Sequence, residues 1–544
     1  MELALQIQTD IDQPLHRQVY EQIRAAILSG RLKSHQRLPA SRELAKSLGI
    51  SRTTVTQSYD QLVSEGYLQT HQGAGTFVCA QIPDELLQAK RVLAQNLTAV
   101  NGAKNHEAKN HLTLSKLSAE AEIPEENAAK IKLSDYGDRI QNTSAERQHQ
   151  TDCKLSFRCG IPAIALFPTQ QWQRLTNRYR TANTHWMNYS DDAMGYWPLR
   201  EQIATYISHA RAIRCQPGQI LITHGTQQAL SLITRLMIDP GDAIAIENPS
   251  YISARRIFVS SGAAVLPIPV DTEGLQMAGP HGLAKLSAKL VYVTPSHQFP
   301  TGVLMSLARR LALLQWAQQA NALIIEDDYD SEFRYSGRPV PALQGLDSEN
   351  RVLYLGTFSK VMFPGLRLGY MVLPPALVPI FRYAKWLSDR QCSLIDQRAL
   401  TTFISEGHLA KHVRRMRSIY DRRRRSLVEG LSSLAAPQAS ESHSPVEILG
   451  DESGLHVMAR LPTLRSNDAV VAQAQAKGVS LFSAQPNYWP DVEKPDVERP
   501  DVERPDVERP DIAGQQGQGE FIFGFGNIDE SEIQAAIARI SPLL

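Results

Sequence analysis

Residues 351–370 read RVLYLGTFSKVMFPGLRLGY, and this stretch decides how most of the chain is interpreted. An apolar run from Val352 to Leu355 predicts a buried strand that ends at Gly356. Polar and charged residues follow this strand: Thr357, Ser359, Lys360 and, seven residues after the lysine, Arg367. Lysine is usually a surface residue, so a lysine placed directly after a buried strand raises the question of a chemical role.

The composition is that of a globular protein with more than one domain. The 544 residues are too many for a single hydrophobic core, and 42% hydrophobic with 21% charged residues are ordinary values. The five cysteines form no C-x-x-C pair, so we predict neither a disulfide framework nor a metal site. The sequence has no basic leader and no apolar run of ~18 residues, which predicts a cytoplasmic protein without membrane contact.

Three regions differ in composition along the chain. Residues 1–79 are compact and patterned, residues 80–150 are polar and are predicted to form a linker with some helix, and residues 151–544 alternate apolar strands with helical periodicity. The last region contains repeats of PDVE[KR] over residues 490–510. A proline at every fifth position excludes helix and central strand, so we predict a disordered, exposed loop there.

The first region has the pattern of a winged helix-turn-helix. Apolar residues at helical spacing predict a first helix, namely Leu15, Val19, Ile23 and Ile27. The stretch LPASRELAKSLGIS predicts a short helix over 42–48, with Ser41 as its N-cap and Gly49 as its end. A third helix begins after Ser51, and GYLQTHQGAGTFV predicts a two-stranded hairpin around Gly73.

This module is predicted to bind double-stranded DNA. Residues 31–54 contain six basic residues against one acidic residue, and a recognition helix enters the major groove with its N-terminal residues toward the bases. The module resembles the GntR family of bacterial regulators through LPASRELAKSLGISRTTV and EGYLQTHQGAGTFV. The resemblance implies Arg42 and Arg52 as base or phosphate contacts and a wing near the minor groove. The candidate DNA contacts are Ser41, Arg42, Arg52, Thr53, Thr54 and Gly73.

Two further strand ends in residues 151–544 carry polar groups. QILITHGTQQALSLITRL reads as a strand followed by a helix whose first amides can bind phosphate, with Gly225, Thr226 and Gln227 at the turn. NALIIEDDYDSEF reads as a strand that ends in acidic residues and Tyr329. Because ligands bind at the carboxyl ends of strands in open α/β sheets, we expect these groups and Lys360 to meet at one rim.

The combination of groups suits pyridoxal phosphate. A lysine amine forms a Schiff base with the cofactor aldehyde, and Lys360 can supply that amine. Asp327 can keep the pyridinium nitrogen protonated, and Tyr329 can donate to the phenolic oxygen. Arg367 and the helix-start amides suit the phosphate, and Tyr251 offers an aromatic face for the ring.

Residues 151–544 resemble fold-type I aminotransferases through TPSHQFPTG and GTFSKVMFPGLRLGY. Together with the winged helix, they resemble the MocR subfamily of GntR regulators, which implies a C-terminal α/β aminotransferase-like domain for effector binding and dimerisation. The resemblance implies Lys360 as the Schiff-base lysine and a homodimer in which Tyr189 reaches the phosphate site of the partner subunit. The other implied cofactor contacts are Asp327, Tyr329, Arg367, Tyr251, Gly225, Thr226, Gln227, Ser359, Thr357 and His297.

Two positions depart from the aminotransferase pattern. Enzymes of this fold often have asparagine where this chain has Phe299, and His297 and Gln298 are the two candidates to replace it. Some members bind an effector carboxylate through a late arginine, but residues 478–491 contain neither Arg nor Lys, which leaves Arg460 as the alternative. The sequence therefore leaves an amine, an amino acid and a vitamin B6 vitamer open as effectors.

Two functions remain in competition. We favour a transcription regulator that senses its effector through a lysine-linked aldimine at Lys360 and is not primarily an enzyme. The alternative is a working aminotransferase with an accessory DNA-binding domain, because the set of cofactor residues is nearly complete. The run HVRRMRSIYDRRRRS places seven arginines between residues 414 and 425, and we interpret it as a charged helix face rather than a second DNA contact.

Overall fold

The computed structural model describes Leu5, Ile7 and residues 13–71, 74–80, 132–143, 153–182, 184–190, 192–337, 340–434, 446–489 and 518–544. The chain forms two compact units, Met1–Asn127 and Ala128–Leu544. Gly73, the repeats over 490–510 and most of the predicted linker over 80–150 lie outside the described residues.

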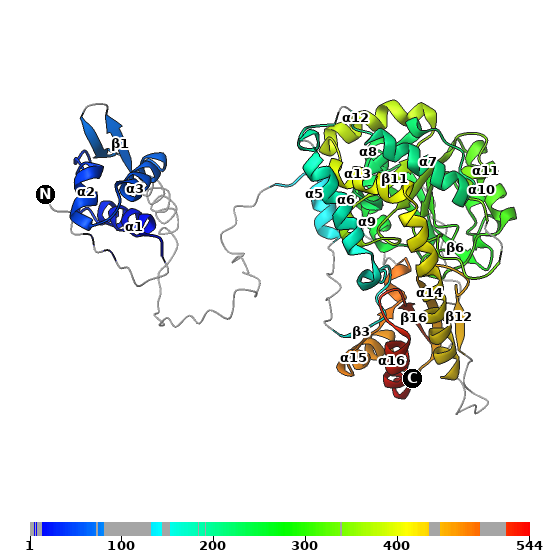
Figure 1. Ribbon diagram of the computed structural model, residues 1–544. Helices are drawn as coiled ribbons and strands as arrows, with labels where there is room; N and C mark the ends of the chain where they lie inside the picture. Colours follow the sequence, from blue (N-terminus) through cyan, green and yellow to red (C-terminus); the bar gives the residue numbers. More distant parts are fainter. Residues whose placement is uncertain are drawn as a thin grey trace, which may run out of the picture. The chain divides into compact units, whose positions relative to one another are not determined.

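The N-terminal unit is a bundle of three helices with a hairpin (Figure 1). Its elements are α1 (Leu15–Leu28), α2 (Ser41–Leu48), α3 (Arg52–Ser64), β1 (Leu68–His71) and β2 (Gly75–Val78). The strands pair antiparallel with Leu68 opposite Val78. Apolar residues at helical spacing, including Val19, Ile23 and Val55, are fully buried between the helices. The predicted winged helix-turn-helix is therefore confirmed.

The start of α2 differs from the prediction by one residue. Ser41 is the first helical residue and Ala40 is the N-cap, so the predicted capping role of Ser41 is wrong. The Glu43 carboxylate accepts the backbone N–H of Ala40 at 3.3 Å, so an acid in the first turn satisfies a free backbone donor instead. The other predicted boundaries are confirmed: Gly49 ends α2 in the left-handed region (φ 67°), and the Ser51 side chain accepts a backbone N–H at the start of α3.

The second unit is built on an eight-stranded sheet with the order β4-β11-β10-β9-β8-β5-β6-β7. Strands β5, β6, β8, β9 and β10 run parallel, whereas β11 lies antiparallel between β10 and β4, and β7 is antiparallel to β6. The strands are β4 (Ile220–Thr223), β5 (Ala243–Asn248), β6 (Ala264–Asp271), β7 (Gly274–Leu275), β8 (Leu290–Val293), β9 (Leu323–Asp328), β10 (Val352–Thr357) and β11 (Gly369–Val372).

Helices cover both faces of this sheet (Figure 1). Alternate residues of one strand point to opposite faces, so Ile222 shares a core with α7, α13 and α14, whereas Leu221 shares a core with α8, α9 and α12. The helices are α6 (Thr169–Ala182), α7 (Trp197–Arg211), α8 (Thr226–Met237), α9 (Ile252–Ser260), α10 (Leu307–Gln319), α11 (Leu343–Leu346), α12 (Val378–Asp389), α13 (Leu394–Ser405) and α14 (His408–Ser433).

A smaller sheet with two helices completes the unit, next to the C-terminal half of α14 (Figure 1). The Gln534 amide of α16 donates to the Ser426 carbonyl of α14 at 3.0 Å. The sheet has the order β12-β13-β16-β15, and a separate pair joins β3 in parallel to β14. The elements are β3 (Leu155–Ser156), β12 (Glu447–Leu449), β13 (His456–Pro462), α15 (Asn467–Ala476), β14 (Val479–Ser480), β15 (Phe482–Ser483), β16 (Gln518–Gly524) and α16 (Glu530–Ile540).

Part of the span predicted as linker is ordered on the second unit. Helix α5 (Asp135–Asn142) packs against α9, and the Arg139 guanidinium donates to the backbone carbonyl of Ser260 at 2.8 Å. The Ser134 side chain accepts the N–H of Gly137 and caps this helix. Residues 132–143 therefore belong structurally to the second unit.

Candidate functional site

Three strand ends of the large sheet bring the predicted site residues to one edge. Strands β9 and β10 are parallel neighbours, with Asp327 in register with Leu355, so Asp327 lies beside the end of the strand that precedes Lys360. Strand β11 lies between β10 and β4 and runs antiparallel to both. Gly369 at the start of β11 is opposite Thr223 at the end of β4. Arg367 lies two residues before β11, so the chain brings it back to the turn between β4 and α8.

The Lys360 side chain is largely enclosed. Its amine donates to the backbone carbonyl of Gly160 at 2.8 Å, and a Cβ atom built on Gly160 would lie 2.5 Å from Nζ. Burial lowers the pKa of Lys360, while the negative charges of Asp330 and Asp327 oppose that change. A lowered pKa increases the neutral fraction of the amine, which is the nucleophilic form. Because a Cβ atom at residue 160 would overlap the amine, the lysine can occupy this position only next to a glycine.

Asp327 has one satisfied and one unsatisfied carboxylate oxygen. The Tyr292 hydroxyl donates to Oδ2 at 2.8 Å, whereas Oδ1 is buried and has no hydrogen-bond partner among the described residues. Burial, together with the nearby Asp328 charge, raises the pKa of Asp327 to about 7. A buried carboxylate oxygen without a partner would be satisfied by a protonated ring nitrogen, so this position fits a pyridinium cofactor.

The start of α8 has the features of a phosphate cradle. Gly225 is the N-cap with φ 92°, and Thr226 and Gln227 form the first turn, whose backbone amides have no helical acceptor. The Arg367 guanidinium donates to the His224 carbonyl at 2.7 Å, and a Cβ atom built on Gly225 would lie 3.8 Å from its Nη1. A fork of positive charge thus lies next to free amides, which suits a phosphate dianion.

Tyr329 and Tyr251 line the edge between these groups. The Tyr329 hydroxyl donates to the His297 carbonyl at 2.8 Å, and burial raises its pKa well above the usual value, so it remains protonated. The Gln227 amide donates to the Tyr251 hydroxyl at 3.3 Å. The Phe299 ring lies between the two tyrosines, 5.9 Å from Tyr251 and 6.2 Å from Tyr329, so aromatic surface is continuous from the cradle to Tyr329.

The structure shows the contacts of the residues that are candidates at the two departures from the aminotransferase pattern. His297 lies against the Tyr329 hydroxyl, with Nδ1 3.1 Å away, whereas Gln298 donates to the Pro249 carbonyl and holds the loop. His297 is therefore the one of the two candidates that contacts this edge. The Arg460 guanidinium is already paired with Glu447 at 2.7 Å and Glu520 at 2.8 Å.

Three remaining candidates differ in what they contact. The Thr357 hydroxyl accepts the backbone N–H of Ser359 at 3.1 Å and shapes the turn before Lys360. Tyr189 does not join the edge within its own chain: its side chain is 68% exposed, and its ring lies 4.4 Å from the Arg390 guanidinium. Its predicted role across a dimer interface stays a prediction.

Several residues of the site were not predicted from the sequence. Asp330 lies 3.2 Å from His297 Nδ1 and accepts the Leu455 N–H at 3.0 Å, and the His456 ring lies 4.6 Å from that of His297. Burial lowers the pKa of His456 to about 3, so this ring is neutral. Asp330 directly follows Tyr329 in DDYDSEF and was open to prediction, whereas Gly160 and His456 have no local signal.

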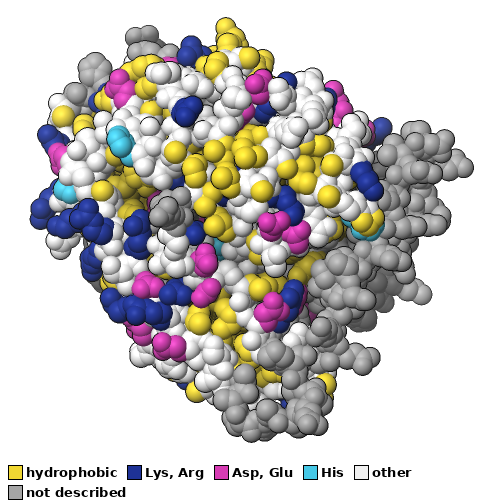
Figure 2. Space-filling view, turned by 90° about the vertical axis from the view of Figure 1, so that its right-hand side faces the viewer, with side chains coloured by type: hydrophobic (Ala, Val, Ile, Leu, Met, Phe, Trp, Pro, Cys, Tyr) yellow, Lys and Arg dark blue, Asp and Glu magenta, His cyan; other side chains and the backbone are white. Residues whose placement is uncertain are grey.

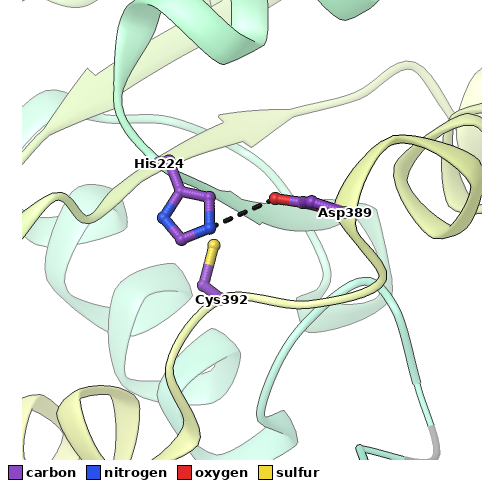
Figure 3. Close-up of side chains that lie close together, drawn as sticks. All are labelled: His224, Asp389 and Cys392. Atoms are coloured by element: carbon purple, nitrogen blue, oxygen red, sulfur yellow. Dashed lines mark ion pairs between the residues drawn. The ribbon is translucent and has the colours of Figure 1, made fainter. Parts of the chain in front are cut away.

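Two groups of side chains have the residue types of a metal site, although the cysteine spacing predicts none. One is the buried group His297, Asp330 and His456, and the other is His224, Asp389 and Cys392, whose side chains point toward one another (Figure 3). In the second group the fully buried Lys385 ammonium lies 2.7 Å from the Asp389 carboxylate and already supplies a positive charge there. Hydrogen bonds to Asp389 and Cys392 raise the pKa of His224 to about 9.

Apart from Gly73, which lies outside the described residues, the predicted DNA contacts lie on helices α2 and α3 of the N-terminal unit. Arg42 is exposed in the first turn of α2, and Arg52 and Thr53 are exposed at the start of α3. The Thr54 hydroxyl lies 2.8 Å from that of Ser51 and takes part in the cap. Gly75 lies in the hairpin at φ 112°, where a Cβ atom would lie 2.9 Å from the Arg37 guanidinium, so glycine allows this arginine to cross the hairpin.

The arginine-rich run lies in α14, and most of its side chains have partners within the second unit. Arg417 donates to the Glu332 carbonyl, Arg422 pairs with Glu530, and the buried Arg423 donates to the Gly526 carbonyl. Two further arginines share one carboxylate, that of Asp421, and these are Arg424 and Arg425. This supports the interpretation of the run as a structural helix face, which here joins α14 to its neighbours.

Among the residues that the structure describes, no helix is both long and apolar enough to cross a membrane. Two family descriptions match the chain: "Aminotransferase class I and II" over residues 164–488 and "Bacterial regulatory proteins, gntR family" over residues 15–78. The probable rhizopine catabolism regulatory protein MocR of Rhizobium meliloti is 36% identical over 482 residues, 88% of this chain and 87% of that protein. The HTH-type pyridoxine biosynthesis transcriptional regulator PdxR of Corynebacterium glutamicum is 29% identical over 96% of this chain and 94% of that protein.

Solved aminotransferase structures are similar to much of the chain. Kynurenine aminotransferase of Pyrococcus horikoshii has a TM-score of 0.60 and 26% identity, and the match covers 76% of this chain and 94% of that chain. LysN, the alpha-aminoadipate aminotransferase of Thermus thermophilus, has a TM-score of 0.63 and 26% identity over 75% of this chain and 96% of that chain.

Proposed function

The chain belongs to the MocR-type regulators of the GntR family, in which a DNA-binding winged helix is joined to an aminotransferase-like domain, and on that premise we propose that it binds pyridoxal 5′-phosphate and senses an amine or a vitamer at Lys360. The observation that carries the proposal is the buried Asp327 Oδ1, which has no hydrogen-bond partner in the described part of the chain and lies on the strand next to the one that precedes Lys360. A cytoplasmic location stays a prediction.

Pyridoxal phosphate, when bound, supplies an aldehyde to a lysine amine and an electron-withdrawing ring. The residues of this chain would each act on one part of it. Lys360 offers an amine whose pKa is lowered by burial, and Asp327 offers its free oxygen to hold the proton on the ring nitrogen. The α8 amides and Arg367 would hold the phosphate, and the protonated Tyr329 hydroxyl would donate toward the ring oxygen in place of the His297 carbonyl.

The ion pairs of Arg460 bear on the chemical class of the effector. Arg460 pairs with both Glu447 and Glu520, so its charge is already compensated. An amino acid recognised through Arg460 would have to displace one of these glutamates, at a cost in ion-pair energy. This favours an amine without a carboxylate, or a vitamer, over an amino acid held by Arg460.

The homodimer is proposed from the exposed apolar face of α12. Tyr383, Trp386 and Leu387 are 67%, 51% and 77% exposed, which is unusual for side chains of this size on one helix. Arg390 lies over the rings of both Tyr189 and Trp386, so the predicted cross-subunit tyrosine adjoins this face. Apolar side chains also gather at the top of Figure 2, the end of the unit where α12 lies in Figure 1. Two winged helices on one dimer would gain affinity for paired DNA half-sites.

The test compares the Lys360→Ala variant with wild-type protein and with Lys289→Ala, a surface lysine paired with Asp242 at 2.6 Å. Wild type and the control are expected to carry the visible absorbance of lysine-bound cofactor, and Lys360→Ala is expected to lose it. An unchanged spectrum in Lys360→Ala would contradict the assignment. Formation of keto acid over many turnovers with an added amino acid would instead favour the aminotransferase alternative.

A further inference from the structure

A cavity of about 480 Å³ lies in the second unit between α7, α14 and the loop that follows β9. Four arginines line it: Arg211, Arg334, Arg414 and Arg417. Hydroxyl groups of Tyr206, Tyr335, Ser296, Ser331, Ser336 and Ser453 complete the polar lining, and Glu332 is its acidic residue. None of these residues was assigned to the cofactor edge or to DNA binding.

Two of the arginines are compensated by carboxylates. Arg211 Nε lies 2.7 Å from the buried Asp328 carboxylate, and its other nitrogens donate to Ser296 and to the Val340 carbonyl. Arg334 pairs at 3.4 Å with Glu452, which is largely exposed. The Nε of Arg334 is nevertheless buried and has no acceptor among the described residues. A buried donor without an acceptor is costly, so a ligand oxygen there would be stabilising.

The other two arginines carry charge that no carboxylate neutralises in the described part of the chain. Arg417 donates through Nε and Nη2 to the backbone carbonyl of Glu332, which orients its guanidinium but leaves its charge. The guanidinium of Arg414, one turn earlier on α14, forms no ion pair or hydrogen bond with any described residue. With Glu332 as the acidic residue, the lining keeps an excess of positive charge.

We propose that this cavity binds a small organic anion that bears a carboxylate or a phosphate group, held by Arg414 and Arg417 with hydroxyl groups around it. The site is distinct from the cofactor edge, but three of its lining residues are close in sequence to residues of that edge. Ser296 precedes His297, Ser331 follows Asp330, and Ser453 lies next to the chain at Leu455 that bonds to Asp330. A bound anion would therefore contact the loops that hold the Tyr329 and His297 pair, and it would act as a second effector.

The test uses the full chain with cofactor bound, so that the phosphate cradle at α8 is already filled. Isothermal titration calorimetry would be run with sodium malonate and, separately, sodium pyrophosphate, at constant ionic strength. The two titrations distinguish a carboxylate from a phosphate ligand. We expect saturable binding of at least one anion to one site per chain, and a weakening of about tenfold or more in Arg414→Gln and in Arg417→Gln, since each loses a charge-assisted bond.

The matched control is Arg415→Gln, an exposed arginine of the same helix that does not line the cavity. It is expected to bind the anion as wild type does, and Arg414→Gln and Arg415→Gln are expected to keep the melting temperature of wild type. Equal weakening in Arg414→Gln and Arg415→Gln would mean attraction to the charge of α14 rather than a site, and would overturn the proposal. Unchanged anion binding in Arg414→Gln with weakened DNA binding would overturn it in favour of a DNA contact.

Discussion

The burial of the Asp327 carboxylate predicts opposite effects on the stability of the cofactor-free protein and on cofactor affinity. Its pKa is raised by burial from 3.8 to about 7, so the folded state disfavours the charged form while the unfolded state does not. The folded pKa lies above the unfolded value, so the cofactor-free protein loses stability as the pH rises from about 4 to about 7 and levels off above that. The difference corresponds to roughly 4 kcal/mol of lost stability at pH 8.

The Asp327→Asn variant removes this charge and keeps the shape of the side chain. The amide oxygen can still accept the Tyr292 hydroxyl, which donates to Asp327 at 2.8 Å. Without cofactor, we expect the variant to be more stable than wild type at pH 8, by up to roughly 4 kcal/mol, and to lose this advantage near pH 4. With cofactor, this advantage is expected to shrink, because the variant loses a charge-assisted bond to the ring nitrogen of about 1.5–3 kcal/mol, or about 10–100-fold in affinity.

The assay is chemical denaturation of cofactor-free protein at pH 5 and pH 8, followed by titration with cofactor monitored by visible absorbance. Asp468→Asn, an exposed acid in the first turn of α15, is the control and is expected to show no such dependence on pH. The difference between each variant and wild type is the quantity compared, because burial also raises the pKa of Glu247 to about 7. A cofactor-free Asp327→Asn protein less stable than wild type at pH 8, or an unchanged cofactor affinity, would refute the reasoning.

Further outcomes are expected at three other places in the chain. Arg52→Ala should weaken binding to specific DNA by ~1–3 kcal/mol if the arginine reads a base, whereas an equal loss on random DNA at the same salt would indicate a phosphate contact. Asp389→Asn should cost about 2–4 kcal/mol in urea unfolding, because the fully buried Lys385 loses its counter-charge, and Lys385→Met should restore part of the loss; independent effects of the two changes would contradict this. The pairing of His224 with Asp389 also contributes to the free energy of unfolding. Because the pKa of His224 is raised from 6.5 to about 9, this contribution should be fully present below pH 6.5 and should be lost as the pH rises through 9. Trp386→Glu should convert the proposed dimer to monomer in sedimentation, and a wild-type monomer would contradict the proposed interface.

The helices and strands that hold the functional residues could be read from the sequence because each has a local signal. The run Ile220–Thr223 is apolar and is followed by Gly225, and it forms β4 with the predicted bounds. The N-terminal module was equally readable, since its apolar residues recur at helical spacing and its turns carry Gly49 and Ser51. The one-residue error at Ser41 arose because Glu43 provides the same kind of bond from inside the helix.

The sequence by itself determined the two folds and the order of the elements, and it yielded the residues proposed for the main site, because apolar spacing, turn residues and short motifs are local properties. Only the tertiary structure decided which distant groups meet. The antiparallel strand β11 brings Arg367 back to the turn after β4, and two glutamates compensate the charge of Arg460. Burial leaves one oxygen of Asp327 without a partner among the described residues. The tertiary structure also brought Asp330, Gly160 and His456 to the site. Such contacts depend on sheet order and burial, which join residues hundreds of positions apart, and no local pattern records them.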